Sequence, residues 1–134
     1  MMMAQAEMAR QEKKGPKRLY AIMYPDCLTD GGGPLSIEDV MKLSMQHTVG
    51  LITTKRSKIP KPFTTIIDFS VTAENTFDPY AFAEVLMNIS ESFEADEYYL
   101  VARGFRFHAA ANLSGFRLIF PHSLLAELRS RMRL

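Results

Sequence analysis

The chain of 134 residues has a single cysteine, Cys27, so no disulfide can form within it. One cysteine is typical of proteins from a reducing compartment, and we expect a cytoplasmic location. The chain also has no apolar run as long as the roughly 18 residues that a membrane-spanning helix needs. The sequence therefore predicts no transmembrane helix.

Patterns typical of enzymes are equally scarce. The histidines His47, His108 and His122 lack the close pairing that suits a metal ion. Cys27 would be a nucleophile only with a histidine within hydrogen-bond reach, and the spacing gives no sign of one. The stretch DGGGP (30–34) lacks the Gly-Lys-Ser/Thr of a phosphate-binding loop, so we interpret it as a flexible turn. We expect no enzymatic activity, metal or cofactor; an enzyme would require a deep polar pocket around His108 or Cys27.

Positive charge is absent from one long segment and concentrated in others. Residues 62–102 contain eight acids but no lysine or arginine. Residues 1–18 carry five cations against two anions, and residues 55–61 carry four cations and no anion. Residues 103–134 hold six arginines against Glu127 alone. Such blocks favour contact with phosphate-bearing partners or with the opposite charge of a second copy, unless folding mixes them on the surface.

Two cationic clusters are the candidate binding residues. We predict that they meet an anionic membrane surface, where each contributes on the order of 1 kcal/mol, or the phosphates of a nucleic acid. A solubilising sheet edge is the alternative explanation. Pro60 and Pro62 favour an extended, exposed loop around the second cluster. The clustered residues are Lys13, Lys14, Lys17 and Arg18 in the arm, and Lys55, Arg56, Lys58 and Lys61 in the loop.

Hydrophobic patterns predict five strands and three helices. Ser36 with Asp39 marks one helix start, and Asp78 with Pro79 marks a second. Gly104 lies inside an apolar, strand-like run and indicates a bulge. The predicted strands are 19–24, 49–54, 63–71, 98–110 and 116–120; the predicted helices are 37–46, one from 79, and a basic one after Pro121.

This order, β-α-β-β-α-β-β-α, predicts an α+β domain: a mainly antiparallel sheet with two or three packed helices. We expect a flexible basic arm over residues 1–18 and a single domain over residues 19–134.

One short motif stands at the end of the first predicted strand. YPDCL, with Tyr24, Pro25 and Leu28 in the fixed positions, resembles the Y-P-x-x-L late-domain motif by which some viral proteins recruit the membrane-scission machinery of their host. A strand end followed by a proline turn explains the same residues.

The order of elements resembles the matrix proteins of rhabdoviruses and related negative-strand RNA viruses. The segments that carry the resemblance are Lys13–Arg18, the helix from Ser36, the strand Phe63–Val71 and the predicted hairpin YLVARGFRFHAAANLSGFRLIF (99–120). The chain is shorter than most of that family, lacks a P-P-x-Y motif and ends in an additional basic helix.

The resemblance implies a non-enzymatic structural protein that self-associates, coats an anionic membrane surface and bridges it to a nucleocapsid, which places it on a membrane or inside a virion. We hypothesise that acids of one copy meet C-terminal arginines of the next. These residues are Glu91, Glu94, Asp96, Glu97, Arg129, Arg131 and Arg133. The alternative is an RNA-binding accessory protein, such as a silencing suppressor, which requires Arg103, Arg106 and Arg117 to share a face with the basic loop.

Overall fold

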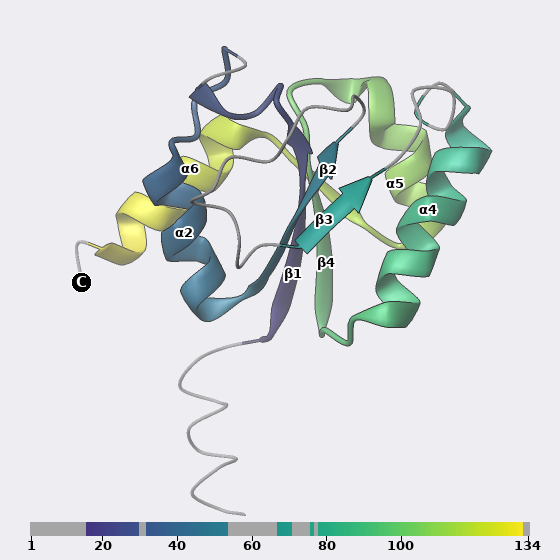
Figure 1. Ribbon diagram of the computed structural model, residues 1–134, viewed down its shortest axis with the longest axis horizontal. Coiled ribbons are helices and arrows are strands. Elements are labelled where there is room, and N and C mark those ends of the chain that lie inside the picture. The colour runs from purple at the N-terminus through teal and green to yellow at the C-terminus, as the bar shows by residue number, and fades with distance from the viewer. Residues whose placement is uncertain (1–15, 30–31, 54–66, 71–75, 77, 133–134) are drawn as a thin grey trace, which may run out of the picture.

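The domain is built on a five-stranded sheet with helices on both faces (Figure 1). The computed structural model describes residues 16–29, 32–53, 67–70, 76 and 78–132. Within these residues the strands follow the spatial order β3-β2-β1-β4-β5. Their bounds are β1 Arg18–Tyr24, β2 Thr48–Thr53, β3 Ile67–Ser70, β4 Glu97–Val101 and β5 Arg117–Ile119.

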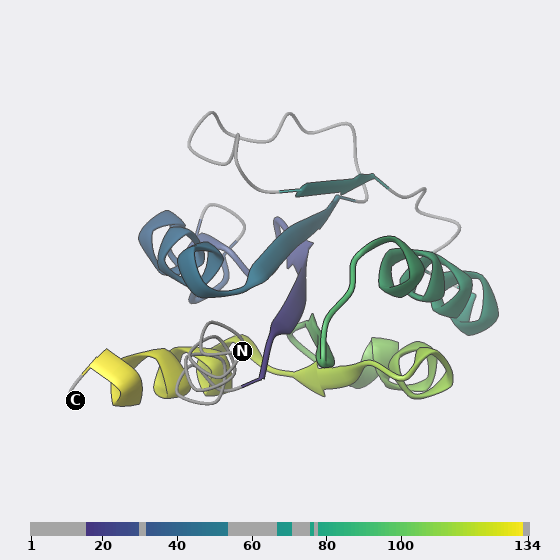
Figure 2. The same cartoon turned by 90° about the horizontal axis from the view of Figure 1, so that it is seen from below.

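The described helices form two layers, one on each face of the sheet (Figure 2). One layer contains α2 (Ile37–Gln46) and α6 (Pro121–Met132), and these two helices contact each other. The opposite layer contains α4 (Pro79–Ser92) and α5 (His108–Ser114), which follows the short 3₁₀ turn η3 (Phe105–Phe107). The arrangement is a doubly wound α/β sandwich.

The predicted α+β fold with a mainly antiparallel sheet is wrong. All four strand pairings are parallel: β1 with β2, β1 with β4, β2 with β3 and β4 with β5. The error arose in residues 98–120, which we interpreted as a hairpin with a bulge at Gly104. The strand ends instead at Val101, and η3 and α5 return the chain across one face so that β5 can pair parallel to β4.

Burial on both faces explains why the strands lack alternation. Six of the seven residues of β1, and five of the six residues of β2, are buried. Strands of a parallel sheet are covered by helices on both sides, so they are continuously apolar. The continuous apolar runs LYAIMY and VGLIT are therefore typical of a parallel sheet. We interpreted them as strands of a mainly antiparallel sheet.

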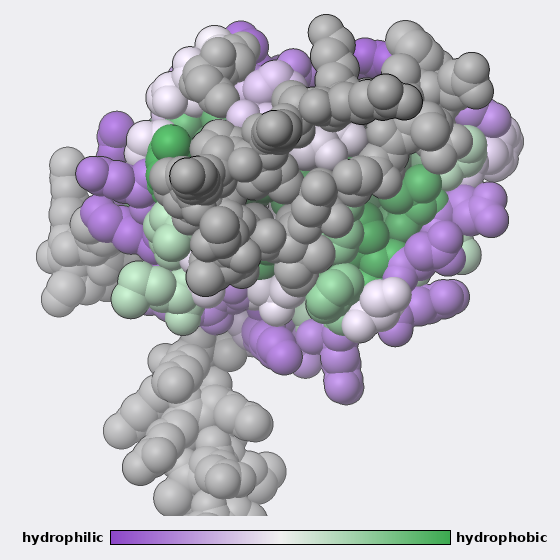
Figure 3. Space-filling model, viewed as in Figure 1, coloured by the Kyte–Doolittle hydropathy of each residue, from purple (hydrophilic) through white to green (hydrophobic). Residues whose placement is uncertain are grey.

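The predicted helix starts are confirmed. Helix α2 has the predicted bounds, and Ser36 and Asp39 form a capping box in which each side chain bonds the backbone N–H of the other. Asp78 caps α4 by accepting from the Tyr80 N–H, and Pro79 takes the first helical position. The inner side of α4 buries Phe82, Ala83, Leu86 and Ile89. In Figure 3 hydrophobic residues (green) face inward from α4, and hydrophilic residues (purple) follow its outer side at the right.

One position in the sheet requires the absence of a side chain. The ring of Phe69 on β3 lies over Gly50 on β2, inside the space that a Cβ atom at residue 50 would take. Phe69 is held there by an edge-to-face contact with Phe93, at 5.7 Å between ring centroids. The ring therefore substitutes for the side chain that β2 lacks.

We expect Gly50→Ala to destabilise the domain by about 1–3 kcal/mol, because the methyl group must displace the Phe69 ring and part of β3. Gly104→Ala is the matched control, since a Cβ at Gly104 meets no atom within 4 Å. Denaturant unfolding of the two variants measures the difference. Equal stability of both variants would contradict the packing of Phe69 on Gly50.

Candidate functional site

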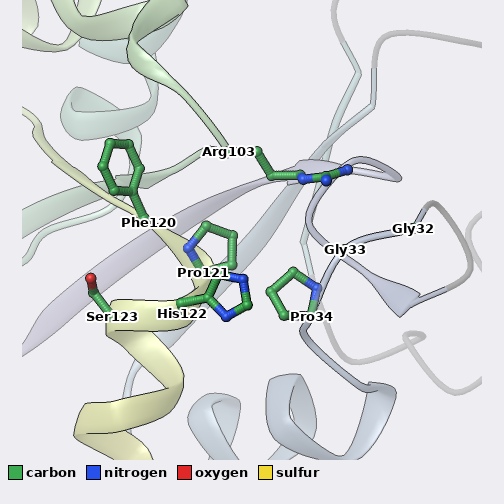
Figure 4. Close-up of a pocket in the computed structure, with 8 residues that line it drawn as sticks. All are labelled: Gly32, Gly33, Pro34, Arg103, Phe120, Pro121, His122 and Ser123. Carbon is green, nitrogen blue, oxygen red and sulfur yellow. The ribbon is translucent and has the colours of Figure 1, made fainter.

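A cavity lies at the carboxyl ends of the strands. It has a volume of about 510 Å³ and is lined by Gly32, Gly33, Pro34, Arg103, Phe120, Pro121, His122 and Ser123 (Figure 4). These residues follow β1, β4 and β5 along the chain. From β1 the chain enters α2 on one face, and from β4 it enters α5 on the other, so the cavity stands at the switch point of the sheet. Ligands of doubly wound sheets bind at this place.

The turn between β1 and α2 is fixed by its own backbone. Thr29 N–H donates to the Leu35 carbonyl and Leu35 N–H to the Cys27 carbonyl, at 2.9 and 3.1 Å. Gly33 N–H donates to Leu28 at 2.7 Å. A Cβ atom at Gly33 would lie 2.5 Å from the Cys27 carbonyl oxygen. The backbone segments around Cys27 and Gly33 therefore approach so closely that residue 33 must be glycine.

Arg103 supplies the positive charge of the cavity. Its side chain extends from the end of β4 toward the glycine turn (Figure 4), and its Nη1 donates to the Asp26 carbonyl at 3.5 Å. Gly32 lies beside the same Nη1 and adopts φ +85°, a left-handed conformation that favours glycine. Among the described residues Arg103 forms no ion pair, so its charge stays available to a ligand.

Two helices begin near the cavity, and the charge of their first turns differs. Helix α2 is closed at its N-terminus by its own capping box, and its first turn contains Glu38 and Asp39. Helix α6 follows Phe120, whose side chain has no polar atom, and its first turn contains no acid. The first N–H groups of a helix have no partner within it and lie at the positive end of its dipole. Because His122 and Ser123 line the cavity, the positive end of α6 is at the cavity.

Comparison with known proteins adds nothing to this geometry. No protein-family model, curated protein or solved structure matches the chain. The site is therefore interpreted from its own residues alone.

Neither residue of the predicted alternative enzyme site lines this cavity. Cys27 is fully buried, and its thiol donates to the Val101 carbonyl at 3.4 Å. Burial, with a smaller effect of the nearby Asp26, raises the pKa of the Cys27 thiol to about 12. The thiolate, which is the reactive form, is therefore scarce at neutral pH. His108 is exposed at the start of α5 with its ring against Phe105.

Most residues of the predicted cationic clusters lie outside the described part of the chain: Lys13, Lys14, Lys55, Arg56, Lys58 and Lys61. Lys17 is exposed, and its N–H donates to the Asp96 carboxylate at 2.8 Å. Arg18 is the first residue of β1. Membrane binding by these clusters stays a prediction.

The late-domain motif is folded into the core. Tyr24 and Leu28 are 5% and 1% exposed, and Pro25 is half-buried. A short linear motif is recognised as an extended, accessible peptide. The folded domain does not present YPDCL in that form.

The residues of the self-association hypothesis lie on two faces. Glu91 and Glu94 are exposed at the end of α4, and Arg129 is exposed on α6 in the opposite layer, whereas Arg133 lies outside the described residues. For Arg131 the structure gives only its place in α6. One molecule therefore keeps Glu91 and Glu94 apart from Arg129, and their pairing across two copies stays a prediction.

Glu97 and Asp96 are already engaged within the chain, at the amino ends of the strands. Glu97 pairs with Arg18 at 3.2 Å and with Arg117 at 2.8 Å, and Arg18 donates to the Tyr20 hydroxyl at 3.0 Å. Arg117 pairs with Tyr99 in the register of β4 and β5, four residues before Arg103, so about 13 Å of strand separates the two arginines. The basic loop lies outside the described residues, so the face that Arg103, Arg106 and Arg117 would share with it in the RNA-binding alternative stays a prediction.

This cluster makes stability depend on pH. Burial alone would raise the pKa of Glu97, but hydrogen bonds from Arg18 and Tyr99 and the charges of Arg18 and Arg117 hold it below the ordinary value. A carboxyl group whose pKa is lower in the folded state stabilises the fold above its ordinary pKa, and this contribution is lost as the pH falls through the lowered value.

We expect Glu97→Gln to reduce the free energy of unfolding at about pH 7 and to have a smaller effect at about pH 2, because the carboxyl group becomes protonated as the pH falls through its lowered pKa. Chemical denaturation at both pH values measures this. Glu91→Gln, which removes an exposed carboxylate on α4, is the control and is expected to change stability little at either pH. A loss for Glu97→Gln that is equal at both pH values would contradict an ionic role.

Proposed function

We propose that this domain binds a small ligand carrying a phosphate or carboxylate group in the cavity at the carboxyl ends of β1, β4 and β5. The observation that carries the proposal is the meeting of two independent positive features, the side chain of Arg103 and the open N-terminus of α6, on one cavity. Each belongs to a different strand–helix connection, so their convergence is a property of the folded sheet.

The two features suit an anion for different reasons. The guanidinium of Arg103 offers planar paired donors that match the oxygens of phosphate and carboxylate. The backbone N–H groups at the start of α6 add neutral donors with the favourable end of the helix dipole. His122, on the same turn, places an imidazole at the cavity (Figure 4) and adds a further donor.

The usual anion site of doubly wound sheets lies at the helix that follows β1. In this chain that position is closed, because the Asp39 carboxylate already accepts the Ser36 N–H at 2.9 Å and would repel an anion. The ligand would therefore use α6 in place of α2. The size of the cavity supports a small molecule, since such sites measure about 300–1,000 Å³.

We expect Arg103→Gln to weaken binding of inorganic phosphate at least tenfold, because a charge-assisted pair is lost. Backbone amide NMR during a phosphate titration measures the affinity and shows where the anion binds. Shifts should centre on the N–H groups of His122 and Ser123.

Arg129→Gln is the matched control, because it removes an exposed arginine of the same helix far from its N-terminus. It should leave phosphate affinity unchanged. Equal weakening by both variants, or amide shifts spread over the surface, would reduce the interaction to general charge attraction and overturn the proposal.

The hairpin over residues 99–120, one of the segments that carried the resemblance to matrix proteins, is replaced by β4, η3, α5 and β5. The matrix-like function stays a prediction, and peripheral membrane binding by the basic clusters is a separate one. No described helix is long and apolar enough to cross a bilayer.

For membrane binding, we expect the protein to float with anionic liposomes and not with neutral ones, and a variant with Lys55, Arg56, Lys58 and Lys61 changed to Glu to lose flotation. Arg103→Gln is the control and should float like the wild type. A wild-type protein that stays at the bottom of the gradient with anionic vesicles would exclude this activity.

A further inference from the structure

A single exposed aromatic ring stands beside the cavity. Phe105 is 73% exposed, and it is the one phenylalanine among the described residues with most of its surface in water. It follows Arg103 by two residues at the start of η3. Its ring contacts the ring of Phe120 edge to face, at 5.1 Å between centroids and 82° between planes. Phe120 lines the cavity, so Phe105 is one ring contact away from it.

Phe105 differs from the other large exposed apolar residues in its contact with a residue of the cavity. The others lie on helices: Ile37 and Met45 on α2, and Tyr80, Met87 and Leu113 on α4 and α5. Phe107, on the same 3₁₀ turn as Phe105, packs inward against Phe82 at 5.0 Å between centroids. The turn therefore sends one aromatic ring into the core and leaves the other exposed against Phe120.

We propose that the ligand is nucleotide-like: an aromatic heterocycle joined to a phosphate. Its ring stacks on Phe105, and its phosphate is held by Arg103 and the N-terminus of α6. This inference rests on the proposed anion site and adds the chemical class of the rest of the ligand.

The physical case combines two interactions at one opening. Stacking of a base on an aromatic side chain is favourable and tolerant of base identity, because every base presents a π face. The edge-to-face contact with Phe120 holds the Phe105 ring from one side and leaves most of its surface open to such a partner. Small-molecule sites combine apolar, aromatic surface with a few placed polar groups, as this opening does.

The test compares ligands that carry one or both parts. Calorimetric titration of the whole protein uses AMP, ribose 5-phosphate, adenosine and inorganic phosphate. We expect AMP to bind roughly tenfold or more tightly than ribose 5-phosphate, since one stacked base contributes about that much. Adenosine should bind weakly, because it lacks the phosphate.

Variants at the rim identify the stacking residue. Phe105→Leu should bring the affinity for AMP down to that for ribose 5-phosphate and leave the affinity for inorganic phosphate unchanged. Phe105→Tyr, which keeps the ring, should retain AMP affinity, and it serves as a second variant if Phe105→Leu folds poorly. Leu113→Ala, which shortens an exposed apolar side chain on α5, is the control and should bind AMP like the wild type.

The two proposals fail in different ways. Equal affinity for AMP and ribose 5-phosphate, or AMP binding that Phe105→Leu does not weaken, would overturn the stacking inference while phosphate binding stands. Absence of binding by all phosphate-bearing ligands would overturn both. Adenosine binding as tightly as AMP would overturn the anion site.

Discussion

The burial of β1 is the constraint on which the other elements depend. The strand pairs in parallel along both of its edges, with β2 and β4, and helices cover both of its faces. Leu19, Ala21 and Ile22 have no exposed surface. Because β1 is paired and covered on all sides, its chain can leave the sheet only at the carboxyl ends of the strands. There the chain from β1 turns to one face of the sheet, and the chain from β4 turns to the other. The cavity exists because these two exits diverge.

The two ends of the sheet carry charge in opposite ways. At the amino ends, Glu97 neutralises Arg18 and Arg117 at short distance, so these charges serve the fold. At the carboxyl ends, Arg103 has only a carbonyl partner among the described residues, and the start of α6 adds positive potential with no acid in its first turn. Arg103 and Arg117 belong to one arginine-rich block of the sequence, but the fold separates their roles. Arg117 stabilises the sheet by pairing with Glu97, and Arg103 remains available to a ligand.

Local signals in the sequence predicted the elements better than their assembly. The capping residues Ser36 and Asp78 each bond the N–H groups beside them, so α2 and the start of α4 could be predicted from short stretches. Strand direction depends on the crossover helices, and α5 was missed because HAAANLS follows an apolar run that continues the strand pattern. Without α5, β4 and β5 become neighbours in a hairpin, and the parallel sheet is lost.

The cavity itself could not be predicted from any single motif. Its residues come from three segments, 32–34, 103 and 120–123, and none of them matches a phosphate-binding pattern. The stretch DGGGP was noticed but interpreted as a plain turn, since it lacks the lysine and serine or threonine of a P-loop. The contribution of this stretch to the site is steric, because Gly33 allows two backbone segments of the turn to approach each other closely. The positive groups come from other segments, Arg103 after β4 and the N-terminus of α6 after β5. Only the strand order brings these groups together.

The shortness of β5 has a consequence for how copies of this domain can meet. A sheet edge offers a row of unpaired backbone groups to any other strand, and long flat edges invite aggregation. The β5 edge is three residues long, begins at the paired Arg117 and is terminated by Pro121, which has no N–H to donate. The sheet is thus protected at this border against extension by a neighbouring strand. Assembly of several copies across the β5 border, where it occurs, would then rest on side chains and not on a shared sheet.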